Sequence, residues 1–388
     1  MALTMNKATR VAFGDVVRLS TERSKDPMAD GLDRYVGLEH LEPGELKIRE
    51  WGDVADGTTF TSVFRPGQVL FGKRRAYQRK VAVADFSGVC SGDIYVFEPK
   101  NKRLLPELLP FLCQTDAFFD YAVGTSAGSL SPRTNWKNLA DFEFALPPLD
   151  EQRRMVEVLQ AARRAHEQLR VLELAISLAQ AARLDLAFPR DKLELEKSPR
   201  LQSMCELVVD GTHFPPKFQK SGIPFLLVSN LEGGRIHWNT EKYVSEESFA
   251  ELTKKWSPRR NDILYSLVGS FGVPALVESD TRFTFQRHIG LIRTRHEELL
   301  PQYLYWYLKS PAGVRQANWR AEGLAQKTIT LGTLRDYSVP SPPIAQQRVL
   351  VHELETLEQL RCNARERAQA ARALQTMAWY KTSDRDTP

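Results

Sequence analysis

The chain has 388 residues, which is too long for one ordinary domain and predicts two or three. Hydrophobic residues make up 42% and charged residues 26%, which excludes a largely disordered protein, and the net charge of +5 favours polyanionic partners. Four scattered cysteines without a Cys-x-x-Cys spacing exclude a disulfide framework and a zinc site, and no run of about 18 apolar residues exists. We therefore expect a soluble, cytoplasmic protein without a membrane partner or a metal.

The first segment, residues 11–146, has short apolar runs separated by Gly, Pro and Asp, which is typical of strands. A helix is expected over 104–119, where leucines recur at spacings of three and four, namely Leu104, Leu105, Leu108, Leu109 and Leu112. The segment is therefore predicted to be an α+β domain.

A proline motif follows this domain and occurs twice. PPLDEQR at residues 147–153 recurs as PPIAQQR at 342–348, 195 residues later. Each copy opens a run without Pro or Gly, over about 150–188 and 345–381. Because proline is tolerated in the first turn of a helix, where its missing N–H would have no partner, each motif predicts the start of a long helix.

The domain between the two helices repeats the order of the first domain. Residues 38–42, 68–71 and 104–106 align with 228–232, 262–265 and 299–301. The chain is therefore expected to consist of two similar α+β domains and two helices, related by a pseudo-twofold repeat, with boundaries at 1–146, 147–190, 191–341 and 342–388.

Both long runs have the alternating steps of four and three that mark the seam of a coiled coil. In the second run the seam is Leu350, Leu354, Leu357, Arg361, Ala364, Ala368 and Ala371; in the first it is Met155, Leu159, Ala162, His166 and Leu169, before an expected phase slip near Leu172. The repeat favours antiparallel packing of the two helices, each about 57 Å long at about 1.5 Å per residue.

His166 and Arg361 occupy the same position in the two seams. One interpretation is that they meet as a polar pair that fixes the register of the helices. The other is that each side chain reaches out to solvent from the seam edge.

A basic segment follows a predicted strand of the first domain. Residues 73–80 read KRRAYQRK, and we expect them to contact DNA through Lys73, Arg74, Arg75, Tyr77, Arg79 and Lys80. The alternative is a solvated basic loop. The matching stretch of the second domain, 266–272, is small and polar, so the two domains are not expected to read the same sequence.

The second domain has its own candidates in the turn-rich stretch 210–217, which reads DGTHFPPK. Its donors and acceptors suit base edges, and basic residues elsewhere in the domain can contact phosphates. The predicted DNA-binding residues of this domain are Thr212, His213, Lys217, Lys220, Arg259, Arg260, Ser270, Arg287 and His288.

Catalytic motifs are missing from the sequence. It has no phosphate-binding or dinucleotide-binding glycine pattern, no His-Glu-x-x-His and no adenine-holding tetrapeptide at its Pro-Pro pairs. We therefore expect a protein that is not an enzyme in its own right.

Taken in order, the duplicated motifs at 147–153 and 342–348, the segment 70–77 and the segments 210–213, 261–266 and 269–272 resemble the specificity subunit of Type I restriction-modification systems. The resemblance covers essentially the whole chain. It implies two target-recognition domains that each read one half of a bipartite, asymmetric site in double-stranded DNA, and an antiparallel coiled coil that sets an unread spacer of up to about 17 base pairs.

The resemblance also implies partners. Two methyltransferase subunits would bind S-adenosylmethionine and methylate adenine N6, and restriction subunits would translocate and cleave DNA with ATP and Mg²⁺. No cofactor is expected in this chain. Two alternatives stay open: a structural scaffold with long helices, and the same reader architecture serving another DNA-modification defence system.

Overall fold

The computed structural model describes residues 8–321, 323 and 327–383, with side chains as far as residue 374. The described residues divide into two units: those of Met1–Arg170 and Arg365–Pro388 form unit 1, and those of Val171–Ala364 form unit 2. Each unit combines one α+β domain with a part of both long helices.

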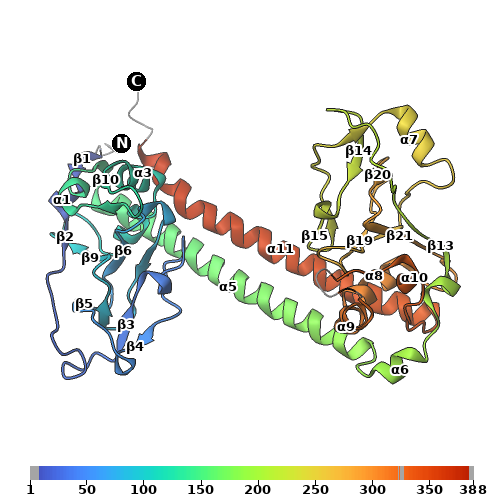
Figure 1. The fold of residues 1–388 in the computed structure, drawn as a ribbon. Helices are drawn as coiled ribbons and strands as arrows, with labels where there is room; N and C mark the ends of the chain where they lie inside the picture. The colour runs from blue at the N-terminus through green and yellow to red at the C-terminus, as the bar shows by residue number, and fades with distance from the viewer. Residues whose placement is uncertain (1–7, 322, 324–326, 384–388) are drawn as a thin grey trace, which may run out of the picture. The chain divides into compact units, whose positions relative to one another are not determined.

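Unit 1 contains two four-stranded sheets (Figure 1). The first is antiparallel throughout, in the order β2 (Val17–Leu19), β9 (Ile94–Pro99), β6 (Val69–Gly72) and β7 (Val81–Val83). The second includes one parallel pair, β3 with β8, in the order β4 (Gly52–Asp53), β3 (Arg34–Val36), β8 (Gly88–Cys90) and β5 (Ser62–Phe64).

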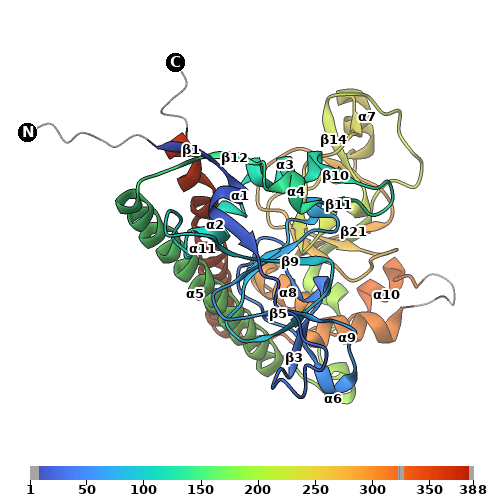
Figure 2. The same ribbon diagram turned by 90° about the vertical axis from the view of Figure 1, so that its left-hand side faces the viewer.

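Short elements complete the domain. Two further strand pairs are β1 (Thr9–Ala12) with β12 (Glu143–Leu146), and β10 (Ser126–Ala127) with β11 (Arg133–Thr134). The helices are α1 (Phe13–Val16), α2 (Leu109–Leu112), α3 (Asp116–Gly124) and α4 (Trp136–Leu139), with 3-10 turns η1 (Leu38–His40), η2 (Val54–Asp56) and η3 (Ala76–Gln78). Figure 2 shows α3, β10, β11 and α4 close together in one part of the unit.

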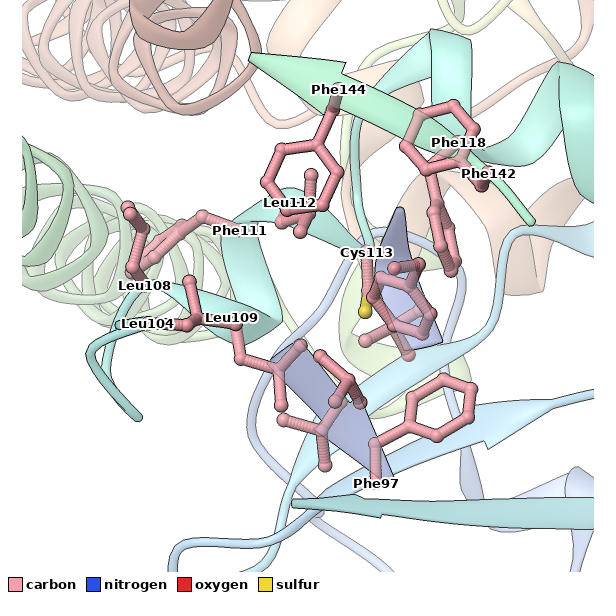
Figure 3. Packing of buried hydrophobic residues seen from close by; sticks show 14 of the residues in the cluster. Phe97, Leu104, Leu108, Leu109, Phe111, Leu112, Cys113, Phe118, Phe142 and Phe144 are labelled. Atoms are coloured by element: carbon pink, nitrogen blue, oxygen red, sulfur yellow. The ribbon is translucent and has the colours of Figure 1, made fainter. Parts of the chain in front are cut away.

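Aromatic side chains fill the core of unit 1 (Figure 3). Phe13 and Phe97 pack edge to face at 5.4 Å, and Phe118 packs on Phe13 at 4.9 Å. Full burial of one such side chain contributes about 1.5–3 kcal/mol, so this cluster fixes the helices against the first sheet.

The single helix expected over 104–119 is interrupted. Only Leu109–Leu112 and Asp116–Gly124 are α-helical; Cys113 is the C-cap of the first, and Thr115 caps the second by accepting a hydrogen bond from Phe118 N at 3.2 Å. Thr115 Oγ1 also donates to Leu112 O at 2.9 Å. A threonine whose side chain bonds the backbone locally favours a helix N-terminus over a helix interior, which explains the break.

Unit 2 repeats the arrangement of the strands. Its main sheet has the order β13 (Cys205–Asp210), β21 (Ile289–Thr294), β18 (Ile263–Ser266) and β19 (Pro274–Leu276). A second sheet, with β14 and β20 parallel, has the order β17 (Tyr243–Val244), β14 (Ile223–Leu226) and β20 (Thr284–Phe285); a further pair is β15 (Leu231–Glu232) with β16 (Arg235–Ile236).

The helices of unit 2 lie mostly after its strands. They are α6 (Lys192–Glu196), α7 (Glu246–Leu252), α8 (Pro301–Lys309), α9 (Pro311–Arg320) and α10 (Leu331–Arg335), with turns η4 (Leu201–Met204) and η5 (Val228–Asn230). Counted along the chain, the strands of both main sheets lie in the order first, fourth, second, third. In each second sheet the parallel pair joins the strand that follows the first main-sheet strand to the strand that precedes the last one. The predicted duplication and the α+β class are thereby confirmed.

The two long helices also form as predicted, as α5 (Leu149–Ala187) and α11 (Ile344–Ser383). Within unit 2 they run antiparallel, since Gln180 Nε2 donates to Leu354 O at 3.3 Å while Arg183, further along α5, pairs with Glu353, earlier in α11. Within unit 1 the ring of His166 bonds Ala368 O at 2.9 Å.

The predicted phase slip near Leu172 is wrong. Leu172 is exposed, and the seam continues without a break through Glu173, Ile176 and Gln180. The sequence hides this continuity because two of the three seam positions are polar. Gln180 is accommodated there by its hydrogen bonds to Leu354 O and to Glu358.

Each Pro-Pro motif is fastened by a buried glutamine. Gln152 is 1% exposed and Gln347 is fully buried. The side chain of Gln152 accepts a hydrogen bond from one backbone N–H and donates to two carbonyl oxygens, at Leu105 N (2.9 Å), Arg103 O (2.8 Å) and Pro147 O (2.8 Å). Gln347 makes the matching set, with Leu300 N (2.9 Å), Glu298 O (2.9 Å) and Pro342 O (2.8 Å).

Candidate nucleic-acid interface

The basic segment of unit 1 leaves one end of the main sheet. Gly72, the last residue of β6, pairs with Ile94, the first residue of β9, and Lys73 N donates to Asp93 O at 2.9 Å. The segment then turns through η3, which Arg75 and Arg79 flank in the left-handed backbone region, each with φ of 55°. Such conformations cost energy in residues other than glycine and are frequent where a side chain must be aimed.

Asp93 organises two arginines at this end of the sheet. Its carboxylate accepts from Arg133 Nε at 2.8 Å and from Arg74 Nη1 at 3.3 Å. Burial alone would raise the pKa of Asp93, but the hydrogen bonds and charges of Arg133 and Arg74 outweigh burial and lower that pKa. One carboxylate therefore holds two guanidinium groups of partly exposed side chains, and one net positive charge remains.

Arg75 and Tyr77 are the most exposed residues of the segment. Both are exposed, Tyr77 to 55%. The Arg75 backbone is held by a bond from its N–H to Pro132 O at 2.7 Å, while its guanidinium makes no hydrogen bond or ion pair with any residue of the described chain. An arginine with a fixed backbone and an unpaired guanidinium group is suited to bind a phosphate or the edge of a guanine base.

The other cations of residues 73–80 are engaged within the unit. Lys73 Nζ lies 4.7 Å from the centre of the Tyr95 ring, and burial lowers the pKa of this lysine. Arg79 pairs with Asp116 at 2.6 Å and lies over the Phe119 ring, and Lys80 Nζ donates to Leu38 O at 2.6 Å. Their role in DNA binding stays a prediction, and their contacts give them a role in the fold.

The corresponding sheet end of unit 2 gathers five of the nine predicted residues. Asp210 pairs with Gly290, and Ser266 pairs with Ile289, so β13 and β18 both finish where β21 begins. Arg287 N donates to Thr212 O at 3.0 Å, and Leu267 N donates to His288 O at 2.8 Å. The residues brought together, which we call the loop cluster of unit 2, are Thr212, His213, Ser270, Arg287 and His288.

The loop after β13 depends on a glycine. A side chain at Gly211 would place its Cβ 2.2 Å from Phe285 O, so only glycine permits this approach of the loop to β20. The exposed ring of His213 then bonds Asp210 through Nε2 at 2.9 Å, which orients the imidazole at the loop surface. In the neighbouring turn the exposed Ser270 bonds Ser266 Oγ through its carbonyl at 2.6 Å.

Arg259 and Arg260 lie at the opposite end of the main sheet. They precede β18, whose first residue Ile263 pairs with Ile292, towards the finish of β21. Arg259 pairs with Glu206 at 2.9 Å. The two arginines therefore do not share a loop cluster with His213, and their contact with DNA stays a prediction.

Lys217 and Lys220 are exposed in the loop that leads to the second sheet. Between them Gln219 bonds the backbone of Tyr243 in β17, and Phe218 packs on Phe225 at 5.0 Å. These two lysines are thus placed along β14 and β17, away from the strand ends that carry Thr212.

Sequence reasoning missed Arg133 and Asp93. Arg133 lies 59 residues after Arg74 in the sequence (133 − 74) and is not part of a basic run, but its backbone forms a β-bridge with Arg74. Unit 2 has the same bridge between Val268 and Thr328. The 195-residue repeat would have pointed to this stretch, since Arg133 and Thr328 are that far apart in sequence.

The two seam residues have separate polar partners. His166 bonds the buried Glu45 through Nε2 at 3.0 Å, and Arg170 pairs with the same carboxylate at 2.9 Å. Burial acts to raise the pKa of Glu45, but His166 and Arg170 outweigh it and lower that pKa. Arg361 donates to Glu358 at 2.7 Å. The register role stays a prediction, with Glu45 and Glu358 as the partners that the structure provides.

Within the ranges that the structure describes, no group of three or more His, Cys, Asp or Glu side chains is placed to hold a metal ion. None of the helices in those ranges is both long and apolar enough to cross a membrane.

Two copies of one α+β domain, each with its loop cluster at the same sheet end and each continuing into a long helix, define a duplicated protein whose cationic loops suit a polyanion. The chain belongs to the family described as the Type I restriction modification DNA specificity domain, whose model matches residues 54–173 and 200–371.

Curated relatives agree with this family. The chain is 27% identical over 286 residues to the Type I restriction enzyme EcoBI specificity subunit of Escherichia coli, a match that covers 66% of this chain and 59% of that protein. It is 22% identical over 370 residues to the MjaVIII specificity subunit of Methanocaldococcus jannaschii, covering 88% and 79%. The chain thus spans less than two thirds of the EcoBI subunit that it matches.

Solved structures show the same fold. The Type I restriction-modification S subunit from M. genitalium matches with a TM-score of 0.63 at 12% identity, covering 100% of this chain and 98% of that one. A chain from a study of complex assembly and conformational transition of the type I R-M system matches with a TM-score of 0.61 at 21% identity, covering 100% of both chains.

Proposed function

We propose that this protein is the DNA-sequence specificity subunit of a Type I restriction-modification complex. Each unit reads one half of a bipartite, asymmetric site in double-stranded DNA, and the paired helices set the unread spacer between the halves. The chain itself has no catalytic role in this proposal. The observation that carries it is the duplicated sheet end, which presents different side chains in the two units.

The difference between the two loop clusters supports an asymmetric site. In unit 1 the loop cluster, formed by Arg74, Arg75 and Arg133, is cationic: Arg74 and Arg133 share the carboxylate of Asp93, and Arg75 is exposed without a charged partner in the described chain. In unit 2 the corresponding turn is small and polar, and His213 and Arg287 take the exposed positions. Because guanidinium groups, imidazoles and hydroxyls fit different base edges, one scaffold with two such clusters would read two different half-sites.

The helix lengths support a spacer role. The two helices have 39 and 40 residues, so each is about 60 Å long at about 1.5 Å per residue. A helix resists bending and compression far better than a loop, so a pair of them can keep a fixed spacing between two recognition surfaces.

An apolar face on α5 supports a protein partner. Val171, Leu174 and Leu178 are 62%, 61% and 63% exposed, and their spacing of three and four places them on one face. With about 100° of rotation per residue, this face is opposite the seam residue Ile176. We assign it to the helices of a methyltransferase subunit, because exposed apolar stripes of this kind are covered in assemblies.

The chemistry then belongs to the partners. Two methyltransferase subunits would bind S-adenosylmethionine and transfer its methyl group to adenine N6 after the base leaves the stack, and restriction subunits would use ATP and Mg²⁺ to translocate and cleave. This chain would select the site and position the adenine.

The test is DNA binding by the chain in complex with its methyltransferase subunits. Affinity for a duplex with the sequence motif that the complex methylates should exceed affinity for a scrambled duplex by about 10³-fold or more. Both affinities should fall as the salt concentration increases. Equal affinity for the two duplexes at every salt concentration would remove the proposal and leave a scaffold as the function.

A further inference from the structure

The hairpin between β10 and β11 exposes a leucine at its tip. Leu130 is 91% exposed, the largest value among the exposed large hydrophobic residues of the described chain. A single exposed leucine is not informative by itself, because much of any protein surface is apolar. Its position is informative, since the hairpin packs on the loop that carries the predicted DNA contacts of unit 1.

Hydrogen bonds join the hairpin to that loop along its length. Arg74 Nε donates to Ser131 Oγ at 2.6 Å, Arg75 N donates to Pro132 O at 2.7 Å, and Thr134 N donates to Lys73 O at 2.9 Å. The two segments therefore form one continuous surface, in which Leu130 is one residue from a partner of Arg74.

The base of the hairpin is also fixed to the rest of the unit. Ser126 Oγ donates to Ala122 O at 2.7 Å, and Tyr95 Oη donates to Thr134 O at 3.1 Å. Gly128 turns the chain with φ of +109°, which other residues rarely adopt. Leu130 is thus held out from an anchored turn, and its exposure is not compensated by any contact that would hide it on a neighbouring element.

We propose that Leu130 of unit 1 makes an apolar contact with a DNA base. Its side chain inserts between the cations that hold the DNA backbone and touches the hydrophobic surface of that base. This inference rests on the proposed function and adds a specificity residue to it. Two parts of a base offer such a surface: the C5 methyl group of thymine in the major groove, and the face of a base at a partly unstacked step.

Unit 2 carries an independent counterpart. Phe214, in the loop after β13, is 84% exposed at the corresponding sheet end. Its backbone is held on both sides by Thr212, whose Oγ1 accepts from Phe214 N at 3.3 Å and donates to Phe214 O at 2.8 Å. Both loop clusters thus present one large apolar side chain among polar ones, although the two residues come from different segments of the domain.

The experiment measures binding of the intact complex to its cognate duplex and to a scrambled duplex, with Leu130→Ala, Arg75→Ala and Leu193→Ala. Leu193 is 71% exposed on α6 and outside both loop clusters, so it is the matched control. Leu130→Ala should weaken cognate binding by roughly 10-fold and leave scrambled binding unchanged, while Leu193→Ala should change neither. Leu130→Met should restore most of the loss.

Changes to the DNA identify the apolar surface. If uracil in place of thymine weakens the wild type and not Leu130→Ala, the contact is the methyl group; if an abasic site or a mismatch in the half-site rescues Leu130→Ala, the contact is an unstacked base. An effect of neither kind would overturn the proposal.

The same variants separate this inference from the proposed function. Cognate binding that falls with Arg75→Ala but not with Leu130→Ala would overturn the leucine contact alone. An equal loss on both duplexes with Leu130→Ala would also overturn it. If neither variant changed binding while the wild type still preferred the cognate duplex, the leucine contact would be overturned and the proposed function would stand; a wild type that bound both duplexes equally would overturn the proposed function.

Discussion

Gln152 and Gln347, 195 residues apart in sequence, fasten the starts of α5 and α11 with the same three hydrogen bonds. Each amide satisfies one backbone N–H and two carbonyl oxygens in a buried place, where unpaired polar groups are costly. The two prolines direct the chain into the helix, and the glutamine ties the first helical turn back to the domain that precedes it.

Gln152→Ala should therefore destabilise the protein. The substitution leaves three backbone groups without partners, and we expect a loss on the order of 3 kcal/mol in the free energy of unfolding. Chemical denaturation monitored by circular dichroism measures this change. Gln347→Ala should have a similar effect, and Gln152→Glu should be as harmful, since a carboxylate cannot donate to two carbonyls. The exposed Gln359→Ala is the control, and an equal stability of all four variants would contradict the fastening role.

Arg75 and Arg79 should separate DNA binding from stability. The Arg75 head is unpaired in the described chain, so Arg75→Ala should weaken DNA binding by about 10-fold at 0.1 M salt and lower the salt slope by about one, without a change in unfolding. Arg79 pairs with Asp116 and lies over Phe119, so Arg79→Ala should lower stability by about 1–2 kcal/mol. Titrations at several salt concentrations, with thermal unfolding of the same samples, measure both effects. The assignment is wrong if the two phenotypes are exchanged.

Arg287 and Arg259 provide the same kind of comparison in unit 2. Arg287 is exposed beside Thr212, whereas Arg259 is at the other sheet end with Glu206. Arg287→Ala should reduce the methylation rate and alter discrimination only in the half-site read by unit 2, and Arg259→Ala should reduce that rate less. Methylation rates on duplexes with single substitutions in each half-site measure this. A larger loss with Arg259→Ala would place the interface at the opposite end.

Acid should loosen the helix pair of unit 2 through Glu358. The hydrogen bond from Arg361 is the largest cause that lowers the pKa of Glu358, from 4.5 to about 2, with burial opposing it. A folded pKa below the unfolded one gives stability that is complete above about pH 4.5 and is lost as the pH falls towards 2, on the order of 3 kcal/mol. The free energy of unfolding measured from pH 6 to pH 3 should therefore fall less steeply in Glu358→Gln.

Glu355 is the control for that measurement, because its shift has the opposite sign. Burial raises the pKa of Glu355, so its charged form is disfavoured in the fold and its contribution to stability falls as the pH rises. Glu355→Gln should thus steepen the acid dependence slightly or leave it unchanged. The same reduction in slope for both variants would refute the role given to Glu358.

Much of the architecture could be predicted because it depends on local sequence patterns. The Pro-Pro motifs and the runs without Pro or Gly predict both helices nearly to the residue, since helix starts depend on local chemistry. The repeat predicts a duplicated fold because two copies of one pattern must bury similar cores. The buried role of Gln152 was not predictable, since a glutamine after two acidic residues reads as solvent-exposed.

The sites were predicted less completely because they depend on where strands end. The sequence indicates that residues 73–80 are basic, but only the pairing of β6 with β9 shows that Asp93 engages Arg74 while Arg75 projects free. Arg259 has the composition of a DNA contact, and only the strand register places it at the other end of the sheet. The continuation of the α5 seam past Leu172 could not be predicted because the seam positions Glu173 and Gln180 are polar, so the hydrophobic periodicity is interrupted there.

Sequencing of methylated bases across a genome tests the central claim most directly. Cells that contain this chain with its methyltransferase partner should carry N6-methyladenine in a motif of two short, unlike blocks separated by an unread spacer of constant length, and the motif should disappear without the chain. A single continuous or palindromic motif, or methylation that persists without the chain, would contradict the account of two unlike readers joined by paired helices.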